Sequence, residues 1–109
     1  MEDPNPDRGT EDDVRARRLH ATIHGNVHRV GFRLYVRQAA RRLGLTGWVR
    51  NRRGGSVEVM VEGTQAELEL LMASLQTGPE GADVTRVDVE WQPAVDRWKG
   101  FRVRWLGFL

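Results

Sequence analysis

The residues best suited to chemistry lie in the segment Gly25–Arg33, GNVHRVGFR, between an apolar strand and a helix. Successive backbone N–H groups at such a glycine-bearing turn form a concave donor surface, and the positive end of the helix dipole adds to it. Arg33 stands on the first helical turn and brings a fork of donors that matches phosphate oxygens. The segment therefore predicts a binding site for a phosphate-like anion.

A second candidate is Asn51, an uncharged amide at the end of a predicted strand, 48–51. The amide is too weak a base to take a proton from water at neutral pH. Its carbonyl oxygen can accept a hydrogen bond and its NH₂ group can donate one, which suits holding a water molecule in place. A phosphate cradle with one water-holding amide is a minimal site for hydrolysing a reactive phosphate ester or anhydride.

Hydrophobic periodicity predicts the elements that must position these residues. Alternating apolar residues predict strands over about 19–23, 48–51, 56–62, 87–91 and 101–105, and helical spacing predicts helices over about 32–43 and 65–77. Thr64 and Glu67 have the spacing of a capping box, and Gly44 and Gly78 are typical helix stops. Two helices cannot cover both faces of such a sheet. We therefore expect an α+β, ferredoxin-like βαββαβ sandwich: an antiparallel sheet of four to five strands with two helices on one face.

The motifs GNVxxVGFR at 25–33 and GWVRNxxxGSVxxxxxG at 47–63 resemble the paired signatures of the acylphosphatase family. The resemblance extends over roughly residues 17–105. It implies an enzyme that hydrolyses acyl phosphates to a carboxylate and inorganic phosphate by direct water attack, without metal, cofactor or covalent intermediate. It also implies that Asn51 orients the attacking water. The phosphate would be held by Arg33 and by the loop residues His28, Arg29, Val30, Gly31 and Phe32.

The loop departs from the family at its centre. The family usually has Val-Gln-Gly-Val where this chain has Val27-His28-Arg29-Val30. If the third of these positions needs a positive φ, Arg29 strains the loop by roughly 1 kcal/mol. If φ is ordinary, Arg29 adds a cation beside the anion. The departure leaves the fold prediction intact and makes catalytic competence a question for experiment.

Composition limits the remaining function classes. The chain has 109 residues without an internal repeat, no cysteine and no long apolar run. Disulfides, thiolate metal sites and cysteine nucleophiles are therefore excluded, and the absence of cysteine fits a reducing cytoplasm.

We expect residues 1–15 to be a disordered acidic leader and residues 16–109 to form the acylphosphatase-like domain, as a cytoplasmic monomer without membrane contact. The basic body favours small anions, and the apolar tail 106–109 could dock on the body or seed self-association.

Other residues have a structural interpretation. His20 and His24 share one strand face, and without a carboxylate or cysteine close in sequence we expect a solvated sheet face and no metal site. The basic residues around Trp48 lack the context of an RNA-binding sheet, so no nucleic acid is expected. We interpret the other tryptophans as core or sheet-face residues and the glutamates as solvated surfaces: Trp91, Trp98 and Trp105, and Glu58, Glu62, Glu67 and Glu69.

Three rival functions remain. The first is a non-catalytic phosphate-binding or regulatory module of the same fold, in which Arg29 has disabled turnover. The second is an enzyme specialised for carbamoyl phosphate, like the corresponding domain of a hydrogenase-maturation protein. The third is RNA binding on the open face of the sheet, which salt-dependent binding would reveal.

Overall fold

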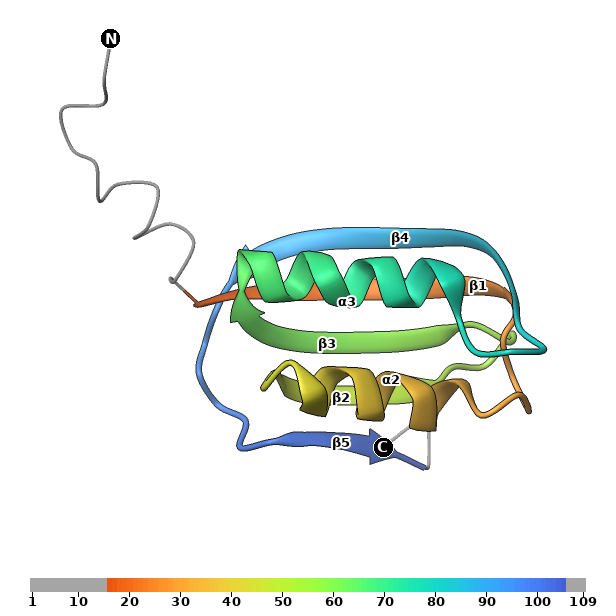
Figure 1. Cartoon of the computed structure of the whole chain (residues 1–109), viewed down its shortest axis with the longest axis horizontal. Helices are drawn as coiled ribbons and strands as arrows, with labels where there is room; N and C mark the ends of the chain where they lie inside the picture. The colour runs from red at the N-terminus through yellow and green to blue at the C-terminus, as the bar shows by residue number, and fades with distance from the viewer. Residues whose placement is uncertain (1–15, 106–109) are drawn as a thin grey trace, which may run out of the picture.

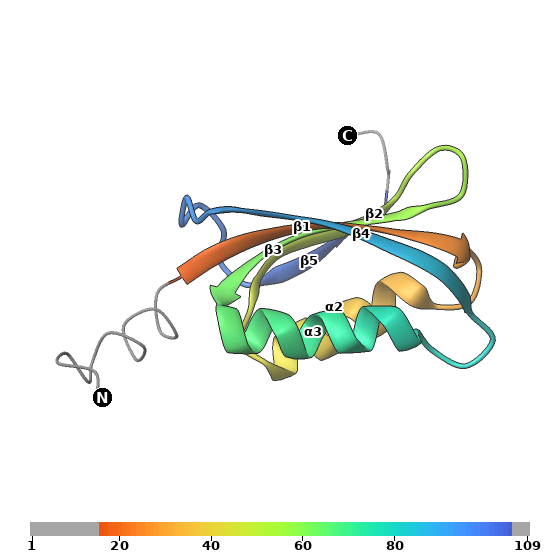
Figure 2. The same ribbon diagram turned by 90° about the horizontal axis from the view of Figure 1, so that it is seen from above.

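Both helices lie on the same face of a five-stranded sheet in the computed structural model, which describes residues 16–105 (Figures 1 and 2). This arrangement confirms the predicted ferredoxin-like sandwich. The predicted leader, 1–15, and the apolar tail, 106–109, lie outside the described residues. In chain order the elements are β1 (Ala16–Asn26), α2 (Phe32–Arg42), β2 (Thr46–Asn51), β3 (Val57–Thr64), α3 (Gln65–Thr77), β4 (Asp83–Pro93) and β5 (Phe101–Arg104).

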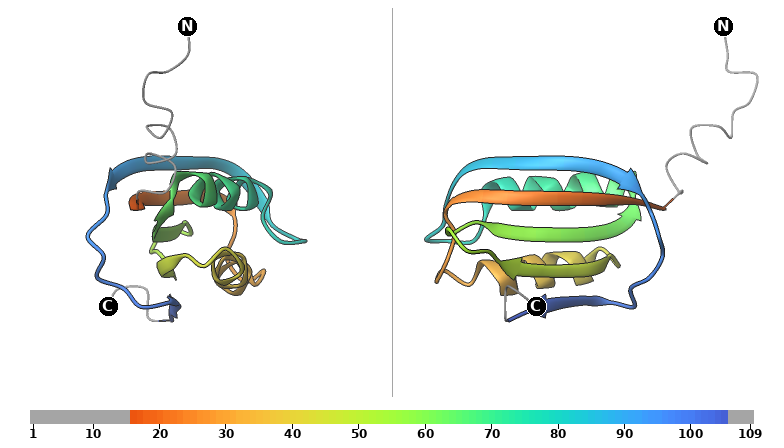
Figure 3. Two further views of the ribbon diagram at one scale, coloured as in Figure 1. Left: turned by 60° about the vertical axis from the view of Figure 1, so that its left-hand side comes forward. Right: turned by 180° about the vertical axis from the view of Figure 1, so that it is seen from behind.

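The sheet has the strand order β4-β1-β3-β2-β5 and is mixed. β1 is antiparallel to β3 and β4, and β3 is antiparallel to β2, but β5 pairs parallel with β2. The prediction of a wholly antiparallel sheet is therefore wrong at this edge. β4 finishes at the end of the sheet where β2 begins, and the segment 94–100 crosses that end (Figure 3). A strand that turns back from there has to run in the same direction as β2.

The core lies between the helices and one face of the sheet. Alternate residues of β1 and β3 are completely buried, among them Leu19, Ile23 and Val59, as period-2 patterning requires. The helical stripes predicted from spacing face them: Phe32, Val36, Ala39 and Ala40 from α2, and Leu68, Leu71 and Leu75 from α3. This packing brings the end of β1, the start of α2 and the ends of β2 and β5 to the same end of the molecule (Figure 1).

The helix boundaries follow the sequence signals. Thr64 Oγ1 accepts a hydrogen bond from the Glu67 N–H at 3.2 Å, and Glu67 Oε1 accepts one from the Thr64 N–H at 3.0 Å. The predicted capping box at the start of α3 is thus confirmed. Gly78 caps the end of α3, and Gly44 follows the cap of α2. α3 therefore begins with its donors satisfied, whereas α2 begins differently, as described below.

Glu62 is nearly buried on the open face of the sheet, at 5% exposure, so its interpretation as a solvated surface is wrong. Its carboxylate accepts hydrogen bonds from Arg18 Nε at 3.1 Å and from the N–H groups of Val95 and Asp96 at 2.7 and 2.9 Å. A carboxylate removed from water needs such charged and N–H donors. Glu62 therefore fastens the segment between β4 and β5 to the middle of the sheet.

Glu58 is also nearly buried, at 8% exposure, and the surface interpretation fails here too. It accepts hydrogen bonds from His20 Nε2 at 2.7 Å and from Arg50 Nε at 2.6 Å, which reach it from the two neighbouring strands. Burial alone raises the pKa of the Glu58 carboxyl. The hydrogen bonds from His20 and Arg50 and their positive charge outweigh burial, and the pKa lies below its ordinary value of 4.5.

The lowered pKa of Glu58 predicts an acid-sensitive part of the stability. Because the carboxyl binds its proton less readily when folded, its contribution is present above pH 4.5 and is lost as pH falls through the folded-state pKa. We expect Glu58→Gln to lower the free energy of unfolding by about 1–2 kcal/mol at pH 7 and by less at pH 3. Urea denaturation of both proteins at the two pH values measures this. An equal loss at both would show that the charge of Glu58 contributes nothing.

Candidate active site

The loop that leads into α2 begins at an irregularity in the pairing of β1 with β4. The register shifts between His24 and Gly25, and Gly25 has a φ of 127°. A Cβ atom at Gly25 would lie 2.0 Å from the carbonyl oxygen of Asp83, so a larger residue would collide with β4. Glycine at this position lets the chain leave the sheet beside β4 and turn toward the helix.

The loop ends on two residues in the left-handed conformation, Arg29 with φ 62° and Gly31 with φ 74°. Gly31 is the N-cap of α2, and no side chain caps the first turn. That turn contains no acidic residue, and it carries Arg33. Uncapped N–H groups at a helix start, with the helix dipole behind them, attract an anion. The start of α2 is therefore electrostatically favourable to a nearby anion.

A hollow of about 110 Å³ lies where this turn meets the end of β2. Arg33 from the first turn of α2 and Asn51 from the last position of β2 both line it. Two elements that are separate in sequence thus bring an arginine and an asparagine to one small space. The other lining residues are Val27, Arg29, Gly31, Phe32, Leu34 and Trp105.

Trp105 reaches the hollow from β5, the edge strand that pairs with β2. It follows β5 directly, and the Arg33 guanidinium carbon lies 4.7 Å from the centre of its ring, within the range of a cation–π contact. The sequence interpretation as a core or sheet-face residue missed this position, since Trp105 is 57% exposed. No local sequence pattern gives this position, because it depends on the parallel direction of β5, which brings the end of β5 beside the start of α2.

Comparison with known proteins agrees with this geometry. The family model described as Acylphosphatase matches residues 19–103, which span the loop and Asn51. The acylphosphatase of Salinibacter ruber is 49% identical over 88 residues, covering 81% of this chain and 93% of that protein. The chain belongs to the acylphosphatase family. Its sheet and helices match the crystal structure of acylphosphatase from Bacillus subtilis with a TM-score of 0.79 at 28% identity, covering 82% of this chain and 99% of that one. The match to an acylphosphatase from Coxiella burnetii has a TM-score of 0.78 at 38% identity, covering 83% and 94%.

Arg29 is the residue at which the sequence left two alternatives open, and its backbone conformation selects the first of them, a strained loop. Its φ of 62° lies in the left-handed region, which costs a residue with a Cβ about 1 kcal/mol. Arg29 is also one of the residues that line the hollow, so it brings an extra positive charge close to the site. The loop therefore carries a modest conformational strain next to an extra positive charge.

We expect Arg29→Gly to raise the free energy of unfolding by about 0.5–1 kcal/mol and to raise the KM for an anionic substrate a few-fold. Arg29→Ala separates the two effects, because it removes the charge but keeps a Cβ in the left-handed conformation. Chemical denaturation and steady-state kinetics on the three proteins give the comparison. A Gly variant less stable than wild type would show that the loop is unstrained at this position.

Two of the predicted loop residues do not line the hollow. The ring of His28 points away to the start of β3, where Nε2 donates to the carbonyl oxygen of Ser56 at 2.9 Å. The N–H of Arg52 donates to the same oxygen at 2.8 Å. Val30 packs against the core as a partly buried residue. His28 therefore ties the loop to the β2–β3 connection that follows Asn51, and sequence reasoning did not foresee this contact.

The histidines on the sheet pair with separate acids. His20 contacts Glu58, and His24 Nε2 lies 3.0 Å from Asp88 Oδ2, so both histidines have carboxylate partners that the interpretation as a solvated face did not foresee. Within residues 16–105, no three histidine or acidic side chains gather in a group that could hold a metal ion. Neither α2 nor α3 has the length and apolarity needed to cross a membrane.

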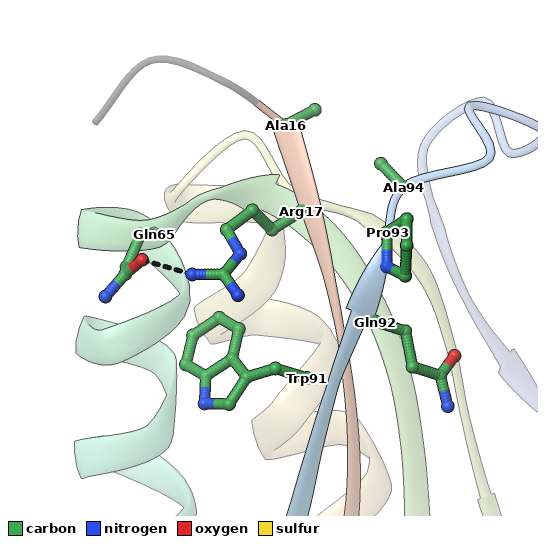
Figure 4. A pocket seen from close by; sticks show the side chains of 7 residues that line it. All are labelled: Ala16, Arg17, Gln65, Trp91, Gln92, Pro93 and Ala94. Atoms are coloured by element: carbon green, nitrogen blue, oxygen red, sulfur yellow. Dashed lines mark hydrogen bonds between the residues drawn. The ribbon is translucent and has the colours of Figure 1, made fainter. Parts of the chain in front are cut away.

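A larger hollow of about 630 Å³ lies at the other end of β1, between β4 and the start of α3 (Figure 4). Arg17 Nη1 donates to Gln65 Oε1 at 2.5 Å, and the guanidinium carbon lies 4.8 Å from the ring centre of Trp91. Among the described residues that line this hollow, Arg17 alone is charged, and it is already engaged by its neighbours. The hollow therefore offers no second set of reactive groups.

Proposed function

We propose that this chain is an acylphosphatase that hydrolyses carboxyl-phosphate mixed anhydrides at the hollow between α2 and β2. The observation that carries the proposal is the meeting of Arg33, Asn51 and the uncapped start of α2 around one small space. A cation and N–H donors suit the phosphoryl oxygens, and a neutral amide suits a water molecule. Membership of the acylphosphatase family supports the same reaction.

In the proposed step the oxygen of a water molecule forms a bond to phosphorus while the bond from phosphorus to the acyl oxygen breaks. The carboxylate departs with the bonding electron pair, and a proton from the attacking water is released to the phosphate product or the solvent. Because a carboxylate is a good leaving group, little acid catalysis is required. The protein has to stabilise charge on the phosphoryl oxygens and orient the water.

The roles of the residues follow from their chemistry. Arg33 and the N–H groups of the loop from His28 to Phe32 bind the phosphoryl oxygens as a phosphate-binding loop. Asn51 accepts a hydrogen bond from the water and holds it in line with the bond that breaks. No acid, base, metal or cofactor takes part. We further propose that the enzyme acts in the cytoplasm as a monomer, with acyl phosphate and inorganic phosphate as its ligands and without nucleic acid or membrane contact.

Hydrolysis of benzoyl phosphate in the presence of EDTA tests the proposal, with the loss of substrate followed by ultraviolet absorbance. We expect turnover at the same rate with and without the chelator. Phosphate binding without turnover would instead favour the non-catalytic module, and recovery of turnover in Arg29→Gly would identify Arg29 as the cause.

A further inference from the structure

Two exposed apolar side chains stand at the rim of the small hollow. Leu34 is 42% exposed and Trp105 is 57% exposed, and both line the hollow that Arg33 and Asn51 share. Leu34 comes from the first turn of α2 and Trp105 follows β5, so the two belong to different elements. Large apolar side chains left in water beside a polar site often mark a surface that binds an apolar ligand.

The size of the hollow determines which part of a substrate can enter it. Its volume of about 110 Å³ is well below the roughly 300–1,000 Å³ of pockets that enclose drug-sized ligands. A phosphoryl group held by Arg33 and the loop would take up most of this space. The acyl group of a bound acyl phosphate would therefore extend outward past the rim.

From this geometry we propose that Leu34 and Trp105 form an acyl-binding rim that favours aromatic acyl phosphates over small ones. The inference rests on the proposed function, since it assigns the substrate class of the same site. The Arg33 guanidinium already occupies one part of the Trp105 ring surface, at 4.7 Å. Trp105 nevertheless remains more than half exposed, and on its surface an aromatic acyl group gains contact area and ring–ring attraction that an acetyl group lacks.

The contact with Arg33 offers a competing explanation for Trp105, namely that it only holds the guanidinium in place. The two roles differ in what they do to substrates. A positioning role affects every acyl phosphate equally, since all carry the same phosphoryl group. A rim that binds the acyl group affects aromatic substrates selectively and leaves inhibition by inorganic phosphate unchanged. The cation–π contact with Arg33 is made by Trp105 and not by Leu34, so substitution of Leu34 tests the rim without removing that contact.

The test compares kcat/KM for benzoyl phosphate and acetyl phosphate in wild type, Trp105→Ala, Trp105→Phe and Leu34→Ala. We expect the ratio of benzoyl to acetyl values to fall about tenfold in Trp105→Ala and about threefold in Leu34→Ala. Trp105→Phe retains an aromatic ring and should keep most of the preference. Leu70→Ala serves as the matched control, because Leu70 is a leucine of α3 with 58% exposure that does not line the hollow.

An unchanged ratio of benzoyl to acetyl kcat/KM in both Trp105→Ala and Leu34→Ala would overturn the proposal of an acyl-binding rim. Equal losses for both substrates in Trp105→Ala, with a weaker inhibition by phosphate, would assign Trp105 to positioning Arg33 and would also overturn it. Circular dichroism and thermal midpoints check that each variant is folded. If Trp105→Ala does not fold, Leu34→Ala still tests the rim. Wild-type protein that hydrolyses neither substrate would instead refute the proposed function, which keeps the two failures distinct.

Discussion

Replacing Arg33 by alanine is expected to lower kcat/KM for benzoyl phosphate by a factor of about 10³, with losses in both binding and rate. The guanidinium at the start of α2 has the planar fork of donors that matches two phosphoryl oxygens. This contact exists in the substrate complex and strengthens as charge shifts in the transition state. Removal of one such donor from a pre-organised site typically costs about 10²–10³ in rate. Steady-state kinetics with inhibition by inorganic phosphate measures both parts of the loss.

Arg42→Ala is the matched control for Arg33→Ala, because Arg42 is an exposed arginine in the last turn of the same helix. It should leave kcat/KM within about twofold of wild type, apart from the small effect of one surface charge. Arg33→Lys keeps a positive charge without the fork and should recover only part of the activity. Near wild-type activity in Arg33→Ala would remove Arg33 from the site and with it the proposed mode of phosphate binding.

Asn51→Ala is expected to act on kcat, lowering it by about 10²–10³ while KM changes little. In the proposed mechanism Asn51 holds the attacking water and does not bind the phosphoryl group, so its loss affects the transition state more than the substrate complex. Saturation kinetics with benzoyl phosphate separates the two constants. A variant with normal kcat and a raised KM would show that Asn51 binds substrate and does not orient water.

Asn51→Asp provides a nearly isosteric comparison. The carboxylate can still accept a hydrogen bond from water, but its negative charge lies in the hollow lined by Arg29 and Arg33. It should therefore raise KM through repulsion of the anionic substrate and through an ion pair with a neighbouring arginine. Increasing ionic strength should reduce the difference in KM between this variant and wild type.

Much of the fold could be predicted from the sequence because it depends on local patterns. The strands, the two helical stripes and the capping box at Thr64 are each encoded within a few neighbouring residues. The direction of β5 is not local. It depends on where β4 ends and on the path of the segment 94–100, which Glu62 holds from the middle of the sheet.

The site shows the same division. The loop with Arg33, and Asn51 at a strand end, stood out because each belongs to a contiguous motif. Trp105 and the contact between His28 and Ser56 arise only when distant segments meet, so no spacing in the chain announces them. Glu58 was misinterpreted for a related reason: alternation placed it on the open face, but its partners on the neighbouring strands remove it from water.

The strand order also affects the tendency of this protein to aggregate through its sheet edges. The edges of the sheet are β4 and β5, and an unprotected edge invites pairing with a second chain and aggregation. β5 is only four residues long and carries Arg102 and Arg104, so two such edges placed side by side would bring arginines near arginines. β4 carries Arg86, Asp88 and Glu90 on the open face of the sheet and ends at Pro93, which lacks an N–H to donate. Charged residues at both edges, with a proline at the end of β4, thus protect the sheet against growth into fibres.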